Sequence, residues 1–245
     1  MGIDVTSDKR VVFNHSHEDL VSTHPDNNPT SFYVNGMPVL AVFRRVMAKS
    51  RHGDGNPLIY ALKRKSGFTI SNTEIKRFMP AFKVIFTKAT KNFSCCKFDY
   101  VLPMPSKHKI SEILAKRVVR ITDYGEVRRD FLRKKTRGEV LAEFERTTIP
   151  KKYKKEAVAF KKSLEKGDPH GIFQMKEVES CLRQYIQPVV LACDPERMNP
   201  NILLVDDLVS SGATFSSAIE ALRIVFPESK IEGLCLLSPL KPKRI

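Results

Sequence analysis

Short apolar runs alternate along the chain with stretches in which apolar residues recur every three or four positions. The runs predict two strands within 31–43, on either side of the turn signal Asn35-Gly36, and further strands at 98–106, 188–193, 202–205 and 231–238. Helical spacing predicts helices over 57–67, from Ser71 onward, 110–121 and 215–226. Ser71 and Glu74 resemble a capping box, and Pro80 is expected to kink or divide the helix that they open.

The later strands are apolar without alternation and are separated by helices. This pattern is typical of a parallel sheet with both faces covered, which is an α/β fold. Residues 1–30 are polar and predict an irregular arm, so 1–56 is expected to form an N-terminal arm and hairpin region. Residues 57–245 are then the α/β domain, with a basic, partly helical insertion at about 123–187.

Basic residues dominate the charge of the chain. The 42 Lys and Arg residues against 27 Asp and Glu residues give a net charge of +15. The stretch 128–166 holds 14 basic and 6 acidic residues, which contributes 14 − 6 = +8 of that excess. Such a field attracts polyanions, so DNA or RNA is an expected partner through residues 128–166, and a solvated lysine-rich helix face is the alternative.

The cysteines predict a reducing compartment. Five cysteines show no CxxC pair and no even spacing, at positions 95, 96, 181, 193 and 235. A disulfide framework or zinc knuckle is therefore not expected, and a cytoplasmic location is. No apolar run of about eighteen residues exists, so no membrane span is expected either.

The stretch ILLVDDLVSSGAT, residues 202–214, carries the clearest candidate chemistry. In parallel sheets, ligands bind beyond the carboxyl ends of the strands, where Asp206 and Asp207 are expected to emerge. A small-residue loop that opens a helix presents backbone N–H groups to a phosphate. Adjacent carboxylates repel a phosphate but suit hydroxyl groups, or a cation that arrives with the ligand. The combination predicts a site for a sugar phosphate.

This stretch resembles the ribose-phosphate signature of type I phosphoribosyltransferases, with Ser210-Ser211 where Thr-Thr is commoner. LIYALKRKSG and VLPMPSKHK resemble segments of the ComF-like branch of that family, which is associated with DNA uptake. His170-Gly171-Ile172-Phe173 resembles its Gly-Ala-Phe segment. The resemblance covers residues 57–238 and implies a type I phosphoribosyltransferase-like parallel sheet flanked by helices.

The resemblance also implies a ligand, phosphoribosyl pyrophosphate (PRPP) with Mg²⁺ carried by the ligand. Asp206 and Asp207 would hold the ribose hydroxyls and, with Lys107, would be the catalytic residues. The residues implied to bind the 5′-phosphate are Ser210, Ser211, Gly212, Ala213 and Thr214. The implied pyrophosphate loop is Pro105, Ser106 and Lys107, and the implied lid residues are Lys134, Lys135 and Arg137.

Three departures from the branch leave a second reading open. The N-terminal four-cysteine zinc ribbon is absent, KHKISEILAK stands in place of an Arg-Gly-Phe-Asn-Gln run, and the insertion 124–187 is longer than a lid requires. A transferase acting on PRPP is the first hypothesis. The alternative is a nucleic-acid-associated accessory or effector protein, in DNA uptake or anti-phage defence, with reduced or repurposed activity. A sugar-phosphate-binding module within a larger complex is the third reading.

Overall fold

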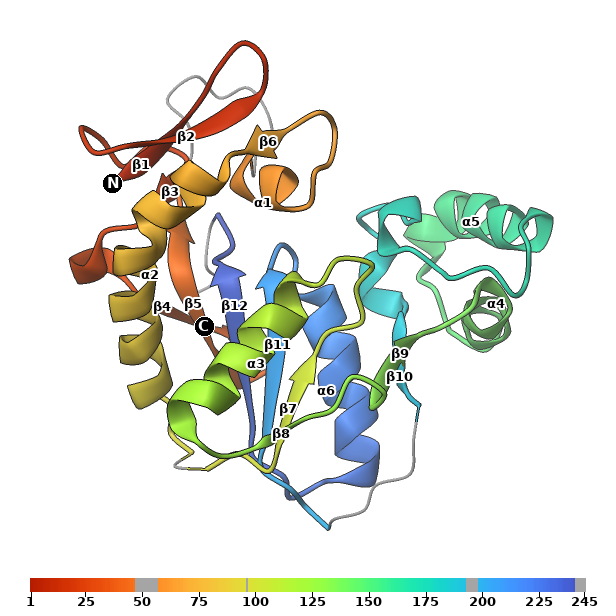
Figure 1. The fold of residues 1–245 in the computed structure, drawn as a ribbon. Coiled ribbons are helices and arrows are strands. Elements are labelled where there is room, and N and C mark those ends of the chain that lie inside the picture. Colours follow the sequence, from red (N-terminus) through yellow and green to blue (C-terminus); the bar gives the residue numbers. More distant parts are fainter. Residues whose placement is uncertain (47–56, 96, 193–197, 241–245) are drawn as a thin grey trace. The chain divides into compact units, whose positions relative to one another are not determined.

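The computed structural model describes residues 1–46, 57–95, 97–192 and 198–240, and the chain divides into two compact units (Figure 1). Unit 1 comprises residues 1–128, 200–211 and 230–245, and unit 2 comprises 129–199 and 212–229. The domain boundary expected after residue 56 is not one of the boundaries between these two units. The stretch 202–214 is shared by the two units, so its parts are described with the unit to which each belongs.

Unit 1 is built on a seven-stranded mixed sheet with the order β3-β5-β12-β11-β7-β8, in which β4 also pairs with β5. Its strands are β3 (Val21–Ser22), β4 (Thr30–Val34), β5 (Met37–Arg45), β7 (Tyr100–Pro103), β8 (Glu126–Val127), β11 (Ile202–Leu208) and β12 (Ile231–Leu237). β5, β12, β11, β7 and β8 run parallel, whereas β3 and β4 are antiparallel to β5. The α/β class is confirmed, and the sheet is mixed because the hairpin β4–β5 adds an antiparallel edge.

The hairpin forms where the turn signal predicted it. Asn35 and Gly36 both have positive φ, 46° and 75°, and Val34 pairs with Met37 across the two-residue turn. Positive φ at both central positions gives a turn whose twist matches that of the flanking strands, and Asn-Gly adopts it readily.

Residues 1–30 are not an irregular arm, so that expectation is wrong. β1 (Gly2–Val5) and β2 (Arg10–Asn14) pair antiparallel, and β6 (Thr69–Ile70) adds a parallel third strand. Val21 to Ser22 then joins the main sheet, and a 3-10 turn, η1 (Pro25–Asn27), follows. Burial of Ile3, Val11 and Phe13 in the main core stabilises this sheet, and their period-two spacing was the signal that the polar composition concealed.

Helices α2 (Asn72–Lys91) and α3 (Ile110–Thr122) pack on the main sheet, and α1 (Pro57–Leu62) lies nearby against β2 and β6 (Figure 1). Phe78, Phe82 and Ile85 of α2 and Leu114 and Val118 of α3 enter one core with residues of β5, β11 and β12. This arrangement of helices follows the predicted apolar spacing.

The start of α2 differs in part from its prediction. Ser71 caps the helix by accepting a hydrogen bond from the Glu74 N–H at 3.2 Å, but the Glu74 carboxylate accepts from the Phe13 N–H at 2.8 Å instead of closing a capping box. The residue thereby ties the N-terminal sheet to the helix. α2 is one continuous helix that contains Pro80, so of the two outcomes expected at Pro80, a kink or a division of the helix, division does not occur.

Unit 2 contains a two-stranded sheet, β9 (Leu132–Lys134) with β10 (Val189–Leu191), and three α-helices, α4 (Arg137–Phe144), α5 (Lys154–Lys166) and α6 (Ala213–Val225). Short 3-10 turns connect these elements, η2 (Lys151–Tyr153), η3 (Met175–Glu177) and η4 (Arg183–Tyr185). The strand expected at 188–193 forms over 189–191, but it pairs antiparallel with β9 and not within the main sheet.

Two groups of contacts hold unit 2 together. Phe131 stacks on Phe226 with ring centres 6.1 Å apart, and the Ser217 hydroxyl accepts from the Val189 N–H, so α6 is fastened to the small sheet. A separate apolar cluster joins α4 and α5 to the chain that follows them. Its buried members are Val140, Phe144, Phe160, Leu164, Phe173, Val178, Leu182 and Ile186. The predicted insertion therefore has a core of its own.

The structure describes three of the five cysteines and most of the chain in which a membrane-spanning helix could occur. Cys95, Cys181 and Cys235 form no disulfide within the described residues, and Cys96 and Cys193 lie outside those residues. Within the described ranges, no helix combines the length and the apolar character needed to cross a bilayer.

Candidate functional site

Strand β11 is longer than predicted and contains both candidate aspartates. The sequence placed the strand end at Val205, whereas β11 continues to Leu208 through pairing with β12. Successive side chains of a strand project in opposite directions. Accordingly, Asp206 contacts Ser111 and Asp207 contacts Lys63, so the two carboxyl groups are held by different partners.

Asp207 forms a buried ion pair. The Lys63 ammonium lies 2.5 Å from Asp207 Oδ2, and their side chains are 18 % and 6 % exposed. Apart from this ion pair, no hydrogen bond reaches Oδ2 from the described residues. A carboxylate withdrawn from water keeps its charge at low cost only with such a partner, and an oxygen with one neighbour retains capacity to accept hydrogen bonds from a ligand.

Asp206 has a weaker set of partners. Its Oδ1 accepts a hydrogen bond from the Ser111 hydroxyl at 3.3 Å and from the Asp207 N–H at 2.8 Å. Burial and, after it, the neighbouring Asp207 charge raise the pKa of Asp206 to about 7, against the lowering effects of the hydrogen bond from the Asp207 N–H, the Lys63 charge and the Ser111 hydroxyl. The carboxyl group can therefore change its charge near neutral pH.

The candidate pyrophosphate loop begins at the same edge of the sheet. β7 runs parallel to β11, Pro103 pairs with Val205, and the Met104 N–H donates to the Val205 carbonyl at 2.8 Å. Residues 105–107 therefore follow immediately beside the aspartates, and α3 returns Ser111 to Asp206. Ser106 and Lys107 are exposed, and the Ser106 hydroxyl accepts from the His108 N–H.

The N-terminus of α3 carries no side-chain cap. Lys109 occupies the capping position without a side-chain hydrogen bond to the helix. The first N–H groups of a helix have no intrahelical partner, and the dipole adds partial positive charge there. An anionic group near residues 106–110 would thus meet backbone donors next to Asp206.

The small-residue loop is divided between the two units. In unit 1, Val209 donates to the Leu237 carbonyl, and Ser210 and Ser211 are exposed. In unit 2, Gly212 precedes α6 with φ of 80° and no side-chain cap. A left-handed residue at this position suits glycine, which has no Cβ atom to strain.

Two candidate lid residues are engaged within unit 2. The Lys135 side chain is buried and ion-paired with Glu143, and the Arg137 guanidinium lies 2.5 Å from Glu177. Lys134 lies in β9 opposite Val189. These contacts join α4 to the strands and turns around it, which is a stabilising role.

Sequence reasoning missed Lys63 and Ser111 as site residues. Lys63 lies in the ALKRKSG segment, which was noted only for its resemblance, and Ser111 lies in the KHKISEILAK segment, which was noted only as a departure. Both are far from Asp206 in sequence, so only the packing of α1 and α3 in the folded chain brings them to the aspartates. Cys235 is also adjacent, opposite Asp206 on β12, but burial raises the pKa of its thiol and keeps it protonated.

The described residues hold no cluster of three or more His, Cys, Asp or Glu side chains suited to a metal ion. Comparison of the sequence with models of protein families and with curated proteins found no match.

Proposed function

We propose that the aspartate site of unit 1 binds a sugar phosphate with a free diol, and that PRPP is this ligand. The observation that carries the proposal is the ion pair of Asp207 with Lys63 beside the partly buried Asp206, at the edge where residues 105–107 leave β7. Carboxylates accept hydrogen bonds from neutral hydroxyls, whereas Lys63, Lys107 and the start of α3 supply positive charge for phosphates. A site that combines carboxylates with positive charge therefore matches a ligand that combines hydroxyls with phosphates.

The proposed ligand exchanges partners with Lys63. When the ribose hydroxyls donate to Asp207, they compete with the ammonium for Oδ2. Lys63 then lies beside the anionic part of the ligand, where its charge is still compensated. Because the cation has a second partner available, the exchange avoids leaving a buried charge unpaired.

Mg²⁺ fits this proposal as part of the ligand. Two carboxylates and the Ser111 hydroxyl are oxygen donors of the kind that Mg²⁺ takes, but the Lys63 ammonium already lies on one of them. A Mg²⁺ ion bound to pyrophosphate oxygens, with few protein ligands, is consistent with this donor set. When bound, it would neutralise part of the leaving group's charge.

The reaction that we propose is substitution at C1 of PRPP: the bond from C1 to pyrophosphate breaks, pyrophosphate leaves, and C1 forms a bond to a nucleophilic atom of the acceptor. Asp206 and Asp207 hold the ribose through its hydroxyls, and their negative charge stabilises the cationic sugar of the transition state. Lys107 and the N–H groups near Ser106 stabilise the departing pyrophosphate. Ser210 and Ser211, which follow the aspartates in unit 1, hold the 5′-phosphate, so that binding orients C1 toward an acceptor. The type I phosphoribosyltransferase-like fold is part of the same proposal.

A titration series tests this function. Calorimetry with Mg²⁺ present should show that PRPP binds at least about tenfold more tightly than ribose 5-phosphate or pyrophosphate alone, because only PRPP engages both groups of the site. Release of pyrophosphate in the presence of nucleobases or nucleotides then measures turnover. Equal affinity for pyrophosphate and PRPP would contradict a role for the aspartates.

The basic stretch supports a second proposal, association with nucleic acid. Its exposed lysines include Lys151, Lys152, Lys154, Lys155, Lys162 and Lys166, which lie on η2 and α5. Exposed cations on one short segment give a phosphate-binding surface whose affinity falls steeply with salt. This proposal includes the accessory role in DNA uptake or defence, and an enzyme held on nucleic acid would combine both functions.

A further inference from the structure

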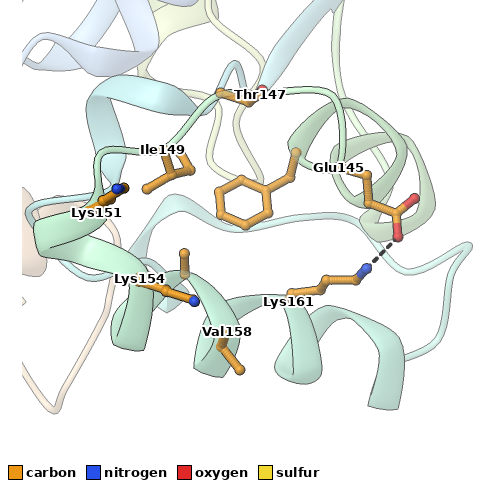
Figure 2. Close-up of a pocket in the computed structure, with 9 residues that line it drawn as sticks. Glu145, Thr147, Ile149, Lys151, Lys154, Val158 and Lys161 are labelled. Carbon is orange, nitrogen blue, oxygen red and sulfur yellow. Dashed lines mark ion pairs between the residues drawn. The ribbon is translucent and has the colours of Figure 1, made fainter.

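Unit 2 contains a hollow beside the exposed lysines. It has a volume of about 500 Å³ and lies between the end of α4, the connection to η2 and the first half of α5 (Figure 2). The residues that line it are Phe144, Glu145, Thr147, Ile149, Lys151, Lys154, Ala157, Val158 and Lys161. Its volume falls within the range of small-ligand sites.

The lining of the hollow combines apolar and cationic side chains. Phe144 is nearly buried against Phe160, with ring centres 5.0 Å apart, whereas Val158 is 48 % exposed. A half-exposed valine beside a hollow gives apolar surface that a flat apolar group can cover.

The charges around the hollow are not balanced. Lys161 is satisfied, because its ammonium lies 2.8 Å from Glu145, toward which it points in Figure 2. Lys151 and Lys154 have no ion pair within the described ranges, and both are exposed. Two lysines without an acidic partner next to an apolar hollow are complementary to a ligand that carries both a phosphate and an aromatic ring, as a nucleotide does.

The lysines also continue past the hollow. Lys162 and Lys166 lie further along α5, which spans about 20 Å at 1.5 Å per residue. A single nucleotide would not reach them, whereas a polymer of phosphates would. An acidic peptide helix would instead need apolar anchors repeated along its length, and here the apolar lining is confined to one hollow.

We propose that this hollow holds one unstacked base of a single-stranded nucleic acid, while Lys151 and Lys154 hold the phosphates beside that base. The inference rests on the second proposed function, to which it adds the form of the partner. Lysines beyond the hollow bind the continuing backbone. A duplex keeps its bases stacked, so it would meet only the lysines and gain nothing from the hollow.

The test measures fluorescence anisotropy of labelled oligonucleotides with the full chain. Three probes of equal length, about 12 nucleotides, separate the contributions: oligothymidine, an abasic strand and a duplex. Oligothymidine is expected to bind about fivefold or more tightly than the abasic strand, since contact with a base is worth roughly this factor. Comparison of the two single strands isolates the base, because they carry the same phosphates.

Two variants address the two parts of the site. Lys151→Gln/Lys154→Gln should weaken both single strands and reduce the salt slope, d log K/d log[salt], by about 1.4 in magnitude, since each single-strand phosphate contributes about 0.7. Val158→Gln should remove the preference for oligothymidine and leave the abasic strand unchanged. Glutamine has nearly the helix propensity of lysine and a higher one than valine, so the changes at Lys154 and Val158 preserve α5, and Lys151 precedes that helix in η2.

The matched control is Lys76→Gln/Lys83→Gln, two exposed lysines of α2 in unit 1 with the same loss of charge. It should retain the binding of all three probes. Equal binding of oligothymidine, abasic strand and duplex would overturn the base site and leave the basic surface standing. Equal losses of binding in the control and in Lys151→Gln/Lys154→Gln would overturn the nucleic-acid proposal as well. The same would follow if an oligoglutamate peptide displaced oligothymidine and the abasic strand equally well.

Discussion

The two units differ in how far their charged side chains are buried. Unit 1 withdraws a few charges from water, so that Asp207 depends on Lys63 and Asp206 has its pKa raised. In unit 2 most of the lysines are exposed to solvent, and others form ion pairs, such as Lys135 with Glu143 of α4. Removing one member of a buried ion pair lowers the free energy of unfolding strongly, whereas removing an exposed charge changes it little. Exposed lysines attract an anionic partner through their combined charge. This difference is the reason why we propose a specific small-ligand site in unit 1 and a broader cationic surface, which binds anions, on unit 2.

The largest effect is expected where a buried pair loses one member. Lys63→Met leaves the Asp207 carboxylate buried without its cation, and we expect the free energy of unfolding to fall by about 3 kcal/mol. Urea denaturation measures this loss. Lys65→Met, two residues away and exposed, should stay within about 0.5 kcal/mol of the wild-type protein.

The double variant Lys63→Met/Asp207→Asn sharpens the same comparison. Because it removes both charges, it should recover at least half of the loss caused by Lys63→Met. If Lys63→Met is no more destabilised than Lys65→Met, the ion pair does not stabilise unit 1, and the contrast with the exposed lysines fails.

A second effect depends on pH. The pKa of Asp206 is raised to about 7 in the folded protein from 3.8, so the folded state binds more protons than the unfolded state between these values, and stability falls as pH rises from about 4 to 7. Asp206→Asn retains an oxygen for Ser111 and removes this dependence. The variant should be about 2–4 kcal/mol more stable than the wild-type protein at pH 8 and equal to it near pH 4.

Thermal unfolding of both proteins across pH 4–8 measures this difference. The two curves should diverge as pH rises and stop diverging above pH 7. Parallel curves over the whole range would show that Asp206 ionises at an ordinary pKa, and that burial does not set its charge.

A smaller effect is expected from an exposed pair in unit 2. The Arg133 guanidinium and the Thr136 N–H lower the pKa of Glu139 to about 2, and Glu139 also closes the capping box of α4. The carboxyl group stabilises the fold above pH 4.5, and this contribution is lost as pH falls toward 2. Glu139→Gln should cost about 1 kcal/mol at pH 7 after allowance for solvent screening.

Chemical unfolding at pH 7 and at pH 3 separates this contribution from general effects of the substitution. Glu165→Gln on α5, which is also exposed and faces Lys161 only at 3.8 Å, is the control and should change stability little. A Glu139→Gln loss that is as large at pH 3 as at pH 7 would contradict the electrostatic explanation.

Local patterns in the sequence were sufficient for most elements of unit 1. Asn35-Gly36 specified its hairpin, and the apolar spacing of α2 and α3 specified their buried faces, because these features depend on neighbours in the chain. The sheet at residues 1–14 was missed because polar residues outnumber the few apolar ones that alternate there. The length of β11 was also underestimated. Adjacent aspartates usually end a strand, but pairing with β12 continues β11 through Asp206 and Asp207.

The site was predictable only in its contiguous part. Asp206, Asp207 and the small residues after them are neighbours in sequence, so their chemistry was evident from one motif. Lys63 and Ser111 come from distant segments and meet the aspartates through the packing of α1 and α3. Lys135 was expected to face a ligand, but the partner Glu143 on α4 engages it, and such pairs cannot be read from charge alone.

The most direct test of the account is a calorimetric titration of PRPP with Mg²⁺ into three proteins. They are the wild-type protein, Asp206→Asn/Asp207→Asn, and Asp8→Asn/Asp26→Asn, which removes the same charge from exposed positions. Circular dichroism establishes that all three are folded. We predict binding by the wild-type and control proteins and none by the Asp206/Asp207 variant. Equal binding by all three, or no binding by the folded wild-type protein, would contradict a sugar-phosphate site at these aspartates.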